Sequence, residues 1–322
     1  MRRILAVCAL VALVLAGVAG GATTGTKITL VAYSTPRDAY AKIIPEFQKT
    51  GAGRDVEFEQ SYGASGEQAR AVKSGLKADV VALSLEPDIT TLVKAGLITR
   101  NWKRNKYEGI VTRSVVVFAV RRGNPKKIKD WEDLIKKDVD VVTPNVQTSG
   151  GAKWNVMAAY GAMRKKGRTH KQAVAYLRSL YSHVVSQDKS AREALQTFLA
   201  GRGDVLLAYE NEAIFANSKG QDVPYVIPKA TIRIDNPIAV LKTSKNKRAA
   251  NAFVNFLHTA KAQTIFAQNG YRPTSPAVAR RFKFPYRPWL FTIKSLGGWA
   301  KVDKQFFDPN TGIVTKIQKE TS

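Results

Sequence analysis

The sequence has few of the residues that support thiol, disulfide and metal chemistry. Its 322 residues include one cysteine, Cys8, and three histidines, His170, His183 and His258, which are far apart along the chain. Cys8 lies in an N-terminal apolar run, so a chain that has lost this run has no cysteine for a disulfide, a thiol nucleophile or a metal site. The histidines do not have the spacing of zinc ligands. Thiol-dependent enzymes, disulfide-stabilised proteins and proteins with a cysteine-ligated metal are therefore excluded for such a chain.

Acidic residues are also scarce. The sequence has 25 Asp and Glu residues and 51 Lys and Arg residues, which gives a net charge of +26, or +24 without Arg2 and Arg3. The basic residues are scattered among apolar segments, whereas nucleic-acid-binding proteins usually have a basic tail or stripe. A solvated basic surface is the simpler interpretation, and it would concentrate small anions near a cleft. Nucleic-acid binding is the alternative, and it predicts affinity that falls steeply with salt.

Residues 1–22 have the features of a secretory signal peptide. Two arginines precede an apolar run over residues 4–18, and small residues follow at positions 20–22. A transmembrane anchor is the alternative, but the run is short, and small residues follow it instead of basic ones. Cys8 is too early in the run for lipid attachment at a cleavage site. We expect an exported, periplasmic protein whose mature chain begins near Thr23.

Strand-like runs alternate with helical patterns along the rest of the chain. Runs rich in Val, Ile, Leu and aromatic residues cover residues 27–33, 55–61, 79–85, 114–120, 139–143, 183–186, 204–209 and 237–241. Helical patterns of about ten or more residues separate most of them. This alternation predicts an α/β fold, with a parallel or mixed sheet between helices. Because no long linker divides the chain, segments 114–120 and 237–241 are the candidates for crossings between two lobes, where they would form a hinge.

Four strands are followed by a small polar residue that can open a helix. These helix starts are predicted at Ser34 or Thr35, at Ser65, at Ser149 and at Ser190. Ser65 and Ser190 each have Gln or Glu three residues later, which is the capping-box spacing. A single match of this kind is usually an ordinary helix cap. Together they indicate a ligand site, because the carboxyl ends of strands in an open α/β sheet share one edge, where ligands bind.

The start at "QTSGGAKWN" contains two glycines. Gly150 and Gly151 follow Ser149 at a place where glycine lowers helix stability. Without β-carbons, their amides are open to an anion, and the Ser149 hydroxyl is a further donor. Each helix N-terminus carries about half a positive charge, so three or four that converge supply about +1.5 to +2. The pattern predicts a site for a dianion that is built from neutral donors.

Four segments carry a family resemblance: "TPNVQTSGGAKWN", "AYENEA", "YRP" at Tyr271–Pro273, and "LFTI" with "GGWAK" near the C-terminus. Through them the chain resembles the periplasmic sulfate-binding proteins of ABC-type importers. The resemblance implies a two-lobed periplasmic binding protein architecture of type II, in which each lobe has a mixed sheet. It places residues 23–113 and 237–322 in lobe I and residues 114–236 in lobe II. The lobes are expected to close on a dehydrated sulfate.

The same resemblance implies a set of ligand contacts. They are the Ser34 amide, the Ser65 and Ser149 hydroxyls, the amides of Gly150, Gly151 and Ala191, and the side chain of Tyr209. Well-known members of the family have a tryptophan in place of Tyr209, and its indole donates to sulfate. A tyrosine hydroxyl can accept as well as donate. We expect a monomeric solute-binding protein with no cofactor, no metal and no catalytic activity, which delivers sulfate to the permease subunits of an ABC importer.

Other ligands and functions remain as alternatives. Thiosulfate, molybdate or tungstate could replace sulfate, because these residue types do not separate the four anions. Phosphate keeps a proton near neutral pH, so a site without a carboxylate should reject it. A carboxylate of Asp188 close to the anion could accept the phosphate proton and reverse that expectation. Arg37 and Arg192 are expected to support the site without touching the anion. Catalytic activity is another alternative, but the sequence has no G-x-S-x-G, H-E-x-x-H or Walker motif.

Overall fold

Two groups of parallel strands and two long antiparallel strands form a mixed sheet. In the computed structural model, which describes residues 25–285 and 289–321, hydrogen-bonded neighbours follow the order β2-β1-β3-β9-β4-β7-β5-β6. These strands are β1 (Thr26–Tyr33), β2 (Val56–Gly63), β3 (Val80–Ala82), β4 (Ile110–Val120), β5 (Val141–Pro144), β6 (Val184–Asp188), β7 (Val205–Tyr209) and β9 (Ala230–Val240). Each overlaps a predicted strand, so the predicted α/β class is confirmed. The predicted signal peptide, residues 1–22, lies outside the described residues.

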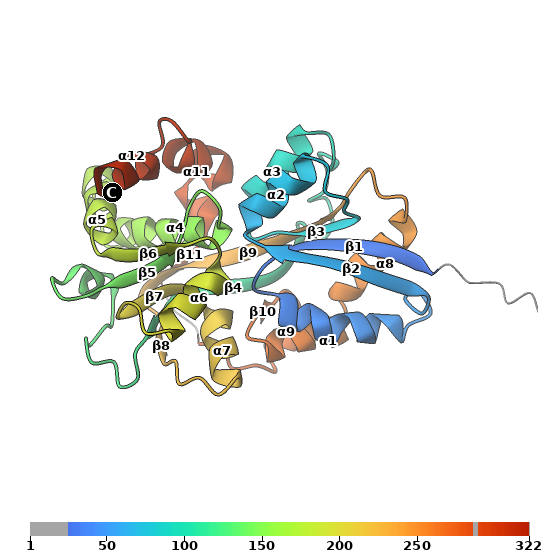
Figure 1. Cartoon of the computed structure of the whole chain (residues 1–322), viewed down its shortest axis with the longest axis horizontal. Helices are drawn as coiled ribbons and strands as arrows, with labels where there is room; N and C mark the ends of the chain where they lie inside the picture. Colours follow the sequence, from blue (N-terminus) through green and yellow to red (C-terminus); the bar gives the residue numbers. More distant parts are fainter. Residues whose placement is uncertain (1–24, 286–288, 322) are drawn as a thin grey trace, which may run out of the picture.

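The strands β4 and β9 lie between the two parallel groups. They pair antiparallel with each other, β9 also pairs with β3, and β4 also pairs with β7. Figure 1 shows both strands running from one half of the molecule into the other. They pair with each other over residues 110–115 and 233–237, so the predicted crossing segments 114–120 and 237–241 overlap this pairing only at their first residues. Movement about these strands stays a prediction.

Helices cover both faces of both strand groups (Figure 1). In β1, Ile28 and Leu30 pack in a core with α1 and α8, whereas Val31 faces a core with α2 and α3. In β4, Phe118 faces α4, and Val117 faces α6. The helices involved are α1 (Arg37–Gln48), α2 (Ser65–Lys73), α3 (Glu86–Lys94), α4 (Gly150–Lys165), α5 (His170–Tyr181), α6 (Ala191–Leu199), α7 (Glu210–Ser218), α8 (Lys247–Leu257) and α9 (Ala260–Gln268). This residue-by-residue alternation is what a sheet buried on both faces requires.

The C-terminal segment packs on the second group of strands. Its elements are β11 (Trp289–Phe291), a 3-10 turn at Ile293–Leu296, α11 (Gly298–Phe307) and α12 (Ile313–Thr321). Trp299 and Ile317 share a core with Met157 of α4 and Leu177 of α5. The expected lobe division placed residues 237–322 in lobe I, but the apolar faces of α11 and α12 are buried against helices expected in lobe II. The other boundaries stay a prediction.

Short elements complete the fold. They are β8 (Tyr225–Val226), β10 (Arg272–Pro273), α10 (Pro276–Ala279) and a 3-10 turn at Trp131–Ile135. The strands β8, β10 and β11 did not stand out in the sequence, because two or three residues show no periodicity. In the described part of the chain, no helix is long and apolar enough to cross a membrane.

Candidate functional site

Several helices begin within a few residues of the carboxyl end of a strand. Helix α1 follows β1, α2 follows β2, α4 follows β5, α6 follows β6, and α7 follows β7. The first amides of each helix have no intrahelical partner, and each N-terminus carries partial positive charge. The contacts described below decide which of these starts lie together.

The start of α4 has a buried hydroxyl residue that makes no cap bond. Ser149 is its N-cap residue, is 4% exposed, and makes no capping hydrogen bond through its side chain. Its backbone amide donates to the carbonyl of Asn145 at 2.8 Å. Among the described residues the Ser149 hydroxyl has no hydrogen-bond partner. A buried hydroxyl at a helix start is thus available to a ligand.

Three other predicted site residues surround Gly151. A β-carbon placed on Gly151 would lie 3.2 Å from Tyr209 Cε2, 3.3 Å from Ala191 Cβ and 3.3 Å from Ser149 Oγ. Gly151 therefore lies beside the start of α6 and beside the ring of Tyr209, the N-cap residue of α7. Of the helix starts predicted from the sequence, those at Ser149 and Ser190 lie together here.

Gly150 faces a different neighbour. A β-carbon there would lie 2.0 Å from Leu85 Cδ2 and 2.4 Å from Ser84 Oγ, residues that follow β3. No side chain can be added without moving one of the two segments. The missing β-carbon at Gly150 thus allows close packing against Ser84 and Leu85, a reason for glycine that the sequence interpretation did not include.

Ser65 is not the N-cap of α2. Ala64 is the N-cap and makes no side-chain bond, so the predicted capping box at Ser65 is wrong. The Ser65 hydroxyl donates to Asp88 Oδ2 at 2.5 Å and accepts from the Ser84 amide at 2.8 Å. These tertiary partners replace the local cap. Burial raises the pKa of Asp88, opposed by Lys153 and by the Ser65 bond.

The start of α2 nevertheless lies beside the start of α4. The Gly66 amide donates to the carbonyl of Thr148 at 2.9 Å, and Arg70 Nη1 donates to the carbonyl of Gln147 at 3.2 Å. Lys189, just before α6, is 3.1 Å from the carboxylate of Glu67. These contacts bring Ser65 close to Ser149, as predicted, although more than 80 residues separate them.

The predicted cap at Ser34 or Thr35 is also absent. The N-cap of α1 is Pro36, and it has no side-chain hydrogen bond. The Thr35 hydroxyl is instead paired with the Tyr271 hydroxyl at 2.8 Å. Ser34 lies between Thr35 and Tyr33, whose ring centroid is 6.3 Å from that of Tyr209. The end of β1 is thus part of the same cluster.

The capping box predicted at the start of α6 is confirmed. Ser190 Oγ accepts from the Glu193 amide at 3.2 Å, and Glu193 Oε2 accepts from the Ser190 amide at 3.0 Å. The box satisfies the third amide of α6. The Ala191 amide, at the first helical position, is left for another acceptor.

Tyr209 is buried and bonded to the opposite strand group. Its hydroxyl lies 2.6 Å from the hydroxyl of Ser84, which also bounds Gly150. The carbonyl of Ser84 accepts from the Trp154 indole and from Asn236, both at 3.0 Å. Burial raises the pKa of Tyr209, so its side chain is neutral and can donate.

Comparison with known proteins agrees with this fold. Residues 28–272 match the family model of bacterial extracellular solute-binding proteins. The chain belongs to this family. It is 45% identical over 312 residues to a sulfate-binding protein of Synechococcus elongatus, covering 93% of this chain and 89% of that one. It is 35% identical to a thiosulfate-binding protein of Pseudomonas aeruginosa, covering 92% of this chain and 94% of that one.

A solved structure is similar over nearly the same range. The sulfate-binding protein SubI of Mycobacterium tuberculosis is 46% identical, with a TM-score of 0.86, and the match covers 88% of this chain and all of that one. The predicted resemblance to sulfate-binding proteins and the predicted periplasmic binding protein fold are confirmed. Relatives of this solute-binding protein are transport proteins.

The charged residues near the site are largely paired. Asp188 accepts from Thr197 at 2.6 Å and from Ser186 at 3.0 Å, so its carboxylate is engaged beside α6. The carboxylate next to the predicted contacts is Asp88, which the sequence did not indicate because it is 23 residues from Ser65. Arg37 lies over the ring of Tyr62, 5.0 Å from its centroid. Among the described residues no acidic, His or Cys cluster could hold a metal ion.

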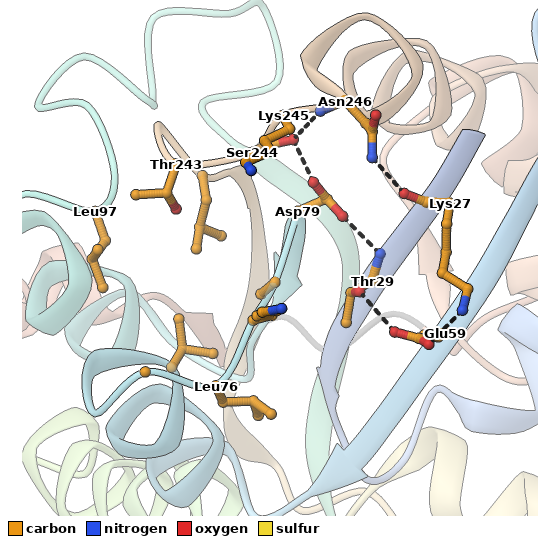
Figure 2. A pocket seen from close by; sticks show the side chains of 15 residues that line it. Lys27, Thr29, Glu59, Leu76, Asp79, Leu97, Thr243, Ser244, Lys245 and Asn246 are labelled. Atoms are coloured by element: carbon orange, nitrogen blue, oxygen red, sulfur yellow. Dashed lines mark hydrogen bonds and ion pairs between the residues drawn. The ribbon is translucent and has the colours of Figure 1, made fainter. Parts of the chain in front are cut away.

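A surface cavity of about 680 Å³ lies at the other end of β1. Figure 2 shows Asp79 at its centre, accepting from the Thr29 amide at 2.9 Å and from the Ser244 hydroxyl at 2.5 Å. Lys27 and Glu59 form an exposed ion pair at its rim. The polar groups at its centre and rim thus bond to one another. The helix starts at the carboxyl ends of the strands remain the candidate site of the solute-binding protein.

Proposed function

We propose that this solute-binding protein captures sulfate between its two strand groups and delivers it to a membrane ABC importer. The proposed contacts are the Ser34 amide, the Ser149 hydroxyl, the amides of Gly150, Gly151 and Ala191, Tyr209, and the Ser65 hydroxyl. The Ser65 hydroxyl has one proton, which must turn from Asp88 to the anion. The sulfate-binding relatives, at 45% and 46% identity, support this ligand. Export by the predicted signal peptide and a monomeric periplasmic form belong to the same proposal.

The observation that carries the proposal is the unpaired start of α4. A 16-residue helix begins at a buried serine whose hydroxyl makes no cap bond, and the starts of α2 and α6 lie beside it. Three helix N-termini contribute about +1.5 in partial charge, close to the demand of a dianion. Neutral donors can hold a dehydrated sulfate without a counter-ion side chain, because the amides are already oriented by their helices.

Exclusion of water strengthens these bonds. Tyr209, Ser149 and Gly151 are buried, and the contacts of Ser84 with Tyr209 and Trp154 join the two sides of the site. In such a low-dielectric environment each donor interacts more strongly with a dianion than it would in water. Release of the anion then requires these contacts to open, which is the step that an importer would control.

Selectivity against phosphate follows from the donors. Hydrogen phosphate needs an acceptor for its proton, and an unpaired buried donor costs about 1 to 3 kcal/mol. Asp188 is engaged by two hydroxyls, and Asp88 already accepts from Ser65. An ionised Asp88 would also repel a dianion of either kind. We expect sulfate to bind more tightly than phosphate.

A competition titration tests the proposal. Trp154 is a built-in reporter, because its buried indole donates to the Ser84 carbonyl and should sense separation of the two sides. Sulfate should change the fluorescence at low concentration, and phosphate should displace it only at much higher concentration. Equal affinities would contradict the selectivity argument, and no response to sulfate would contradict the proposed ligand.

Thiosulfate is the second candidate. The thiosulfate-binding relative of Pseudomonas aeruginosa is 35% identical over nearly the whole chain. Thiosulfate has one sulfur in place of an oxygen, and Tyr209 presents a hydroxyl where the family resemblance expects an indole. Thiosulfate, molybdate and tungstate belong in the same titration, and the tightest of them defines the main ligand.

A further inference from the structure

Arg192 makes four polar contacts from the second position of α6. Its Nε and Nη2 donate to the two carboxylate oxygens of Glu212 at 2.7 and 2.9 Å. Nη1 donates to Asp38 Oδ2 at 3.2 Å, and Nη2 donates to the carbonyl of Thr35 at 3.1 Å. The guanidinium lies over the ring of Phe215, 3.8 Å from its centroid. Such a fork holds one orientation far better than a lysine could.

These contacts join two segments that both carry proposed anion donors. On one side Arg192 directly follows Ala191, and on the other its partner Thr35 directly follows Ser34. Asp38 lies in the first turn of α1, which belongs to the first strand group, whereas Arg192 and Glu212 lie on α6 and α7 of the second group. Arg192 is therefore bonded to both sides of the site.

The charge of Arg192 is fully committed to this cluster. Its side chain is 16% exposed and that of Glu212 only 1% exposed, while Asp38 is 30% exposed and also lies 3.9 Å from Lys219. Burial alone would lower the pKa of Arg192, but the adjacent Glu212 carboxylate raises it overall. The positive charges of Arg192 and Lys219 equal the negative charges of Asp38 and Glu212, so this cluster has no net charge with which to attract the anion.

We infer that Arg192 is a clamp that fixes the Ala191 and Ser34 amides relative to each other and so couples anion binding to closure of the two strand groups. It is a positioning residue and does not touch the anion. The inference rests on the proposed function, because it concerns the donors of that site. If Arg192 only held α6 to α7, its pair with Glu212 would be enough. Its hydrogen bonds to Asp38 and Thr35, which we call the arm across the site, would then have no role.

The Asp38→Asn variant separates these two roles. It weakens the arm across the site and leaves the buried pair of Arg192 with Glu212 in place, so the protein should fold normally. Glu46→Gln is the matched control, because Glu46 lies on the same helix, is 25% exposed, and also pairs with two cations, Lys49 and Lys261. Neither cation of Glu46 contacts the proposed site. Both variants remove one negative charge.

Stopped-flow fluorescence of Trp154 measures the dissociation rate of sulfate. For Asp38→Asn we expect a dissociation rate about three- to tenfold higher than for the unaltered protein, since a partly exposed charged hydrogen bond is lost. Glu46→Gln should leave the rate unchanged. The Arg192→Lys variant, which cannot form the fork, should give a larger increase. An unchanged rate in Asp38→Asn would overturn the inference.

A second readout keeps the clamp testable if sulfate is the wrong ligand. Failure of the unaltered protein to bind sulfate, thiosulfate, molybdate or tungstate would refute the proposed function alone. The distance between spin labels on α1 and α7, measured without ligand, then reports the clamp directly. Asp38→Asn should lengthen or broaden this distance and Glu46→Gln should not, whereas equal distributions in both variants would refute the clamp.

Discussion

The starts of α4 and α5 have a hydroxyl residue at the same position but differ in how it is bonded. At α5, Thr169 Oγ1 accepts from the Gln172 amide at 3.2 Å, and Gln172 Oε1 accepts from the Thr169 amide at 2.9 Å. At α4, Ser149 makes no capping bond, and glycines occupy the first two helical positions. The start of α5 is exposed and complete in itself, whereas the start of α4 is buried and leaves its donors free. A helix start that is buried and unsatisfied is the better candidate for a ligand site.

The largest expected effect is that of Gly150→Val. The new side chain would collide with Leu85 and Ser84, which lie 2.0 and 2.4 Å from the first added carbon. The clash would push the start of α4 away from the segment after β3, so sulfate affinity should fall about 100-fold or more. Gly51→Val is the control, since no atom lies within 4 Å of a β-carbon there. Calorimetric titration showing normal affinity in Gly150→Val would contradict the packing described for this glycine.

Ser149→Ala should separate binding from stability. Loss of a hydrogen bond to a charged ligand should weaken sulfate binding by about 1.5 to 3 kcal/mol. The unfolding temperature without ligand should hardly change, because the Ser149 hydroxyl makes no cap bond. Calorimetry and thermal melting measure the two quantities. A stability loss with unchanged affinity would make Ser149 an ordinary cap.

Asp88→Asn should strengthen anion binding. The variant removes a negative charge next to the site, while the asparagine carbonyl can still accept the hydrogen bond that Ser65 donates to Asp88 at 2.5 Å. Two unit charges about 4 Å apart interact by about 1 kcal/mol in water and by about 4 kcal/mol at an effective dielectric constant of about 20, so affinity should rise at least several-fold. Titration at neutral pH measures the change. Weaker binding would show that the carboxylate itself is needed to orient Ser65.

Thr169→Ala completes the comparison from the side of α5. Loss of its capping box should lower the free energy of unfolding by about 1 kcal/mol. Sulfate affinity should stay the same, because α5 does not begin at the site. Denaturant unfolding measures the first quantity and titration the second. A fall in affinity would remove the contrast between the two helix starts.

The main strands and the helix starts could be predicted from the sequence because both depend on local patterns. Runs rich in Val, Ile, Leu and aromatic residues located β1 and β4, and the Ser-x-x-Glu spacing located the capping box at Ser190. The same local rule was wrong at Ser65, where Asp88 and the Ser84 amide compete for the hydroxyl.

Contacts between distant segments could not be predicted in the same way. Ser84 and Leu85, which fill the space beside Gly150, are 65 or more positions away in the chain. The buried partner of Arg192, Glu212, follows it by 20 positions, and Asp38 precedes it by 154. No periodicity links such residues. The reason for the glycine at position 150 therefore became visible only in the folded structure.

A crystal structure with bound selenate tests the central claim most directly. Selenate has the shape and charge of sulfate, and the anomalous scattering of selenium locates it without ambiguity. The account predicts one selenate within hydrogen-bond distance of Ser149 Oγ and the Gly151 amide, with no lysine or arginine side chain in contact. A selenate held by basic side chains, or bound away from the start of α4, would contradict it.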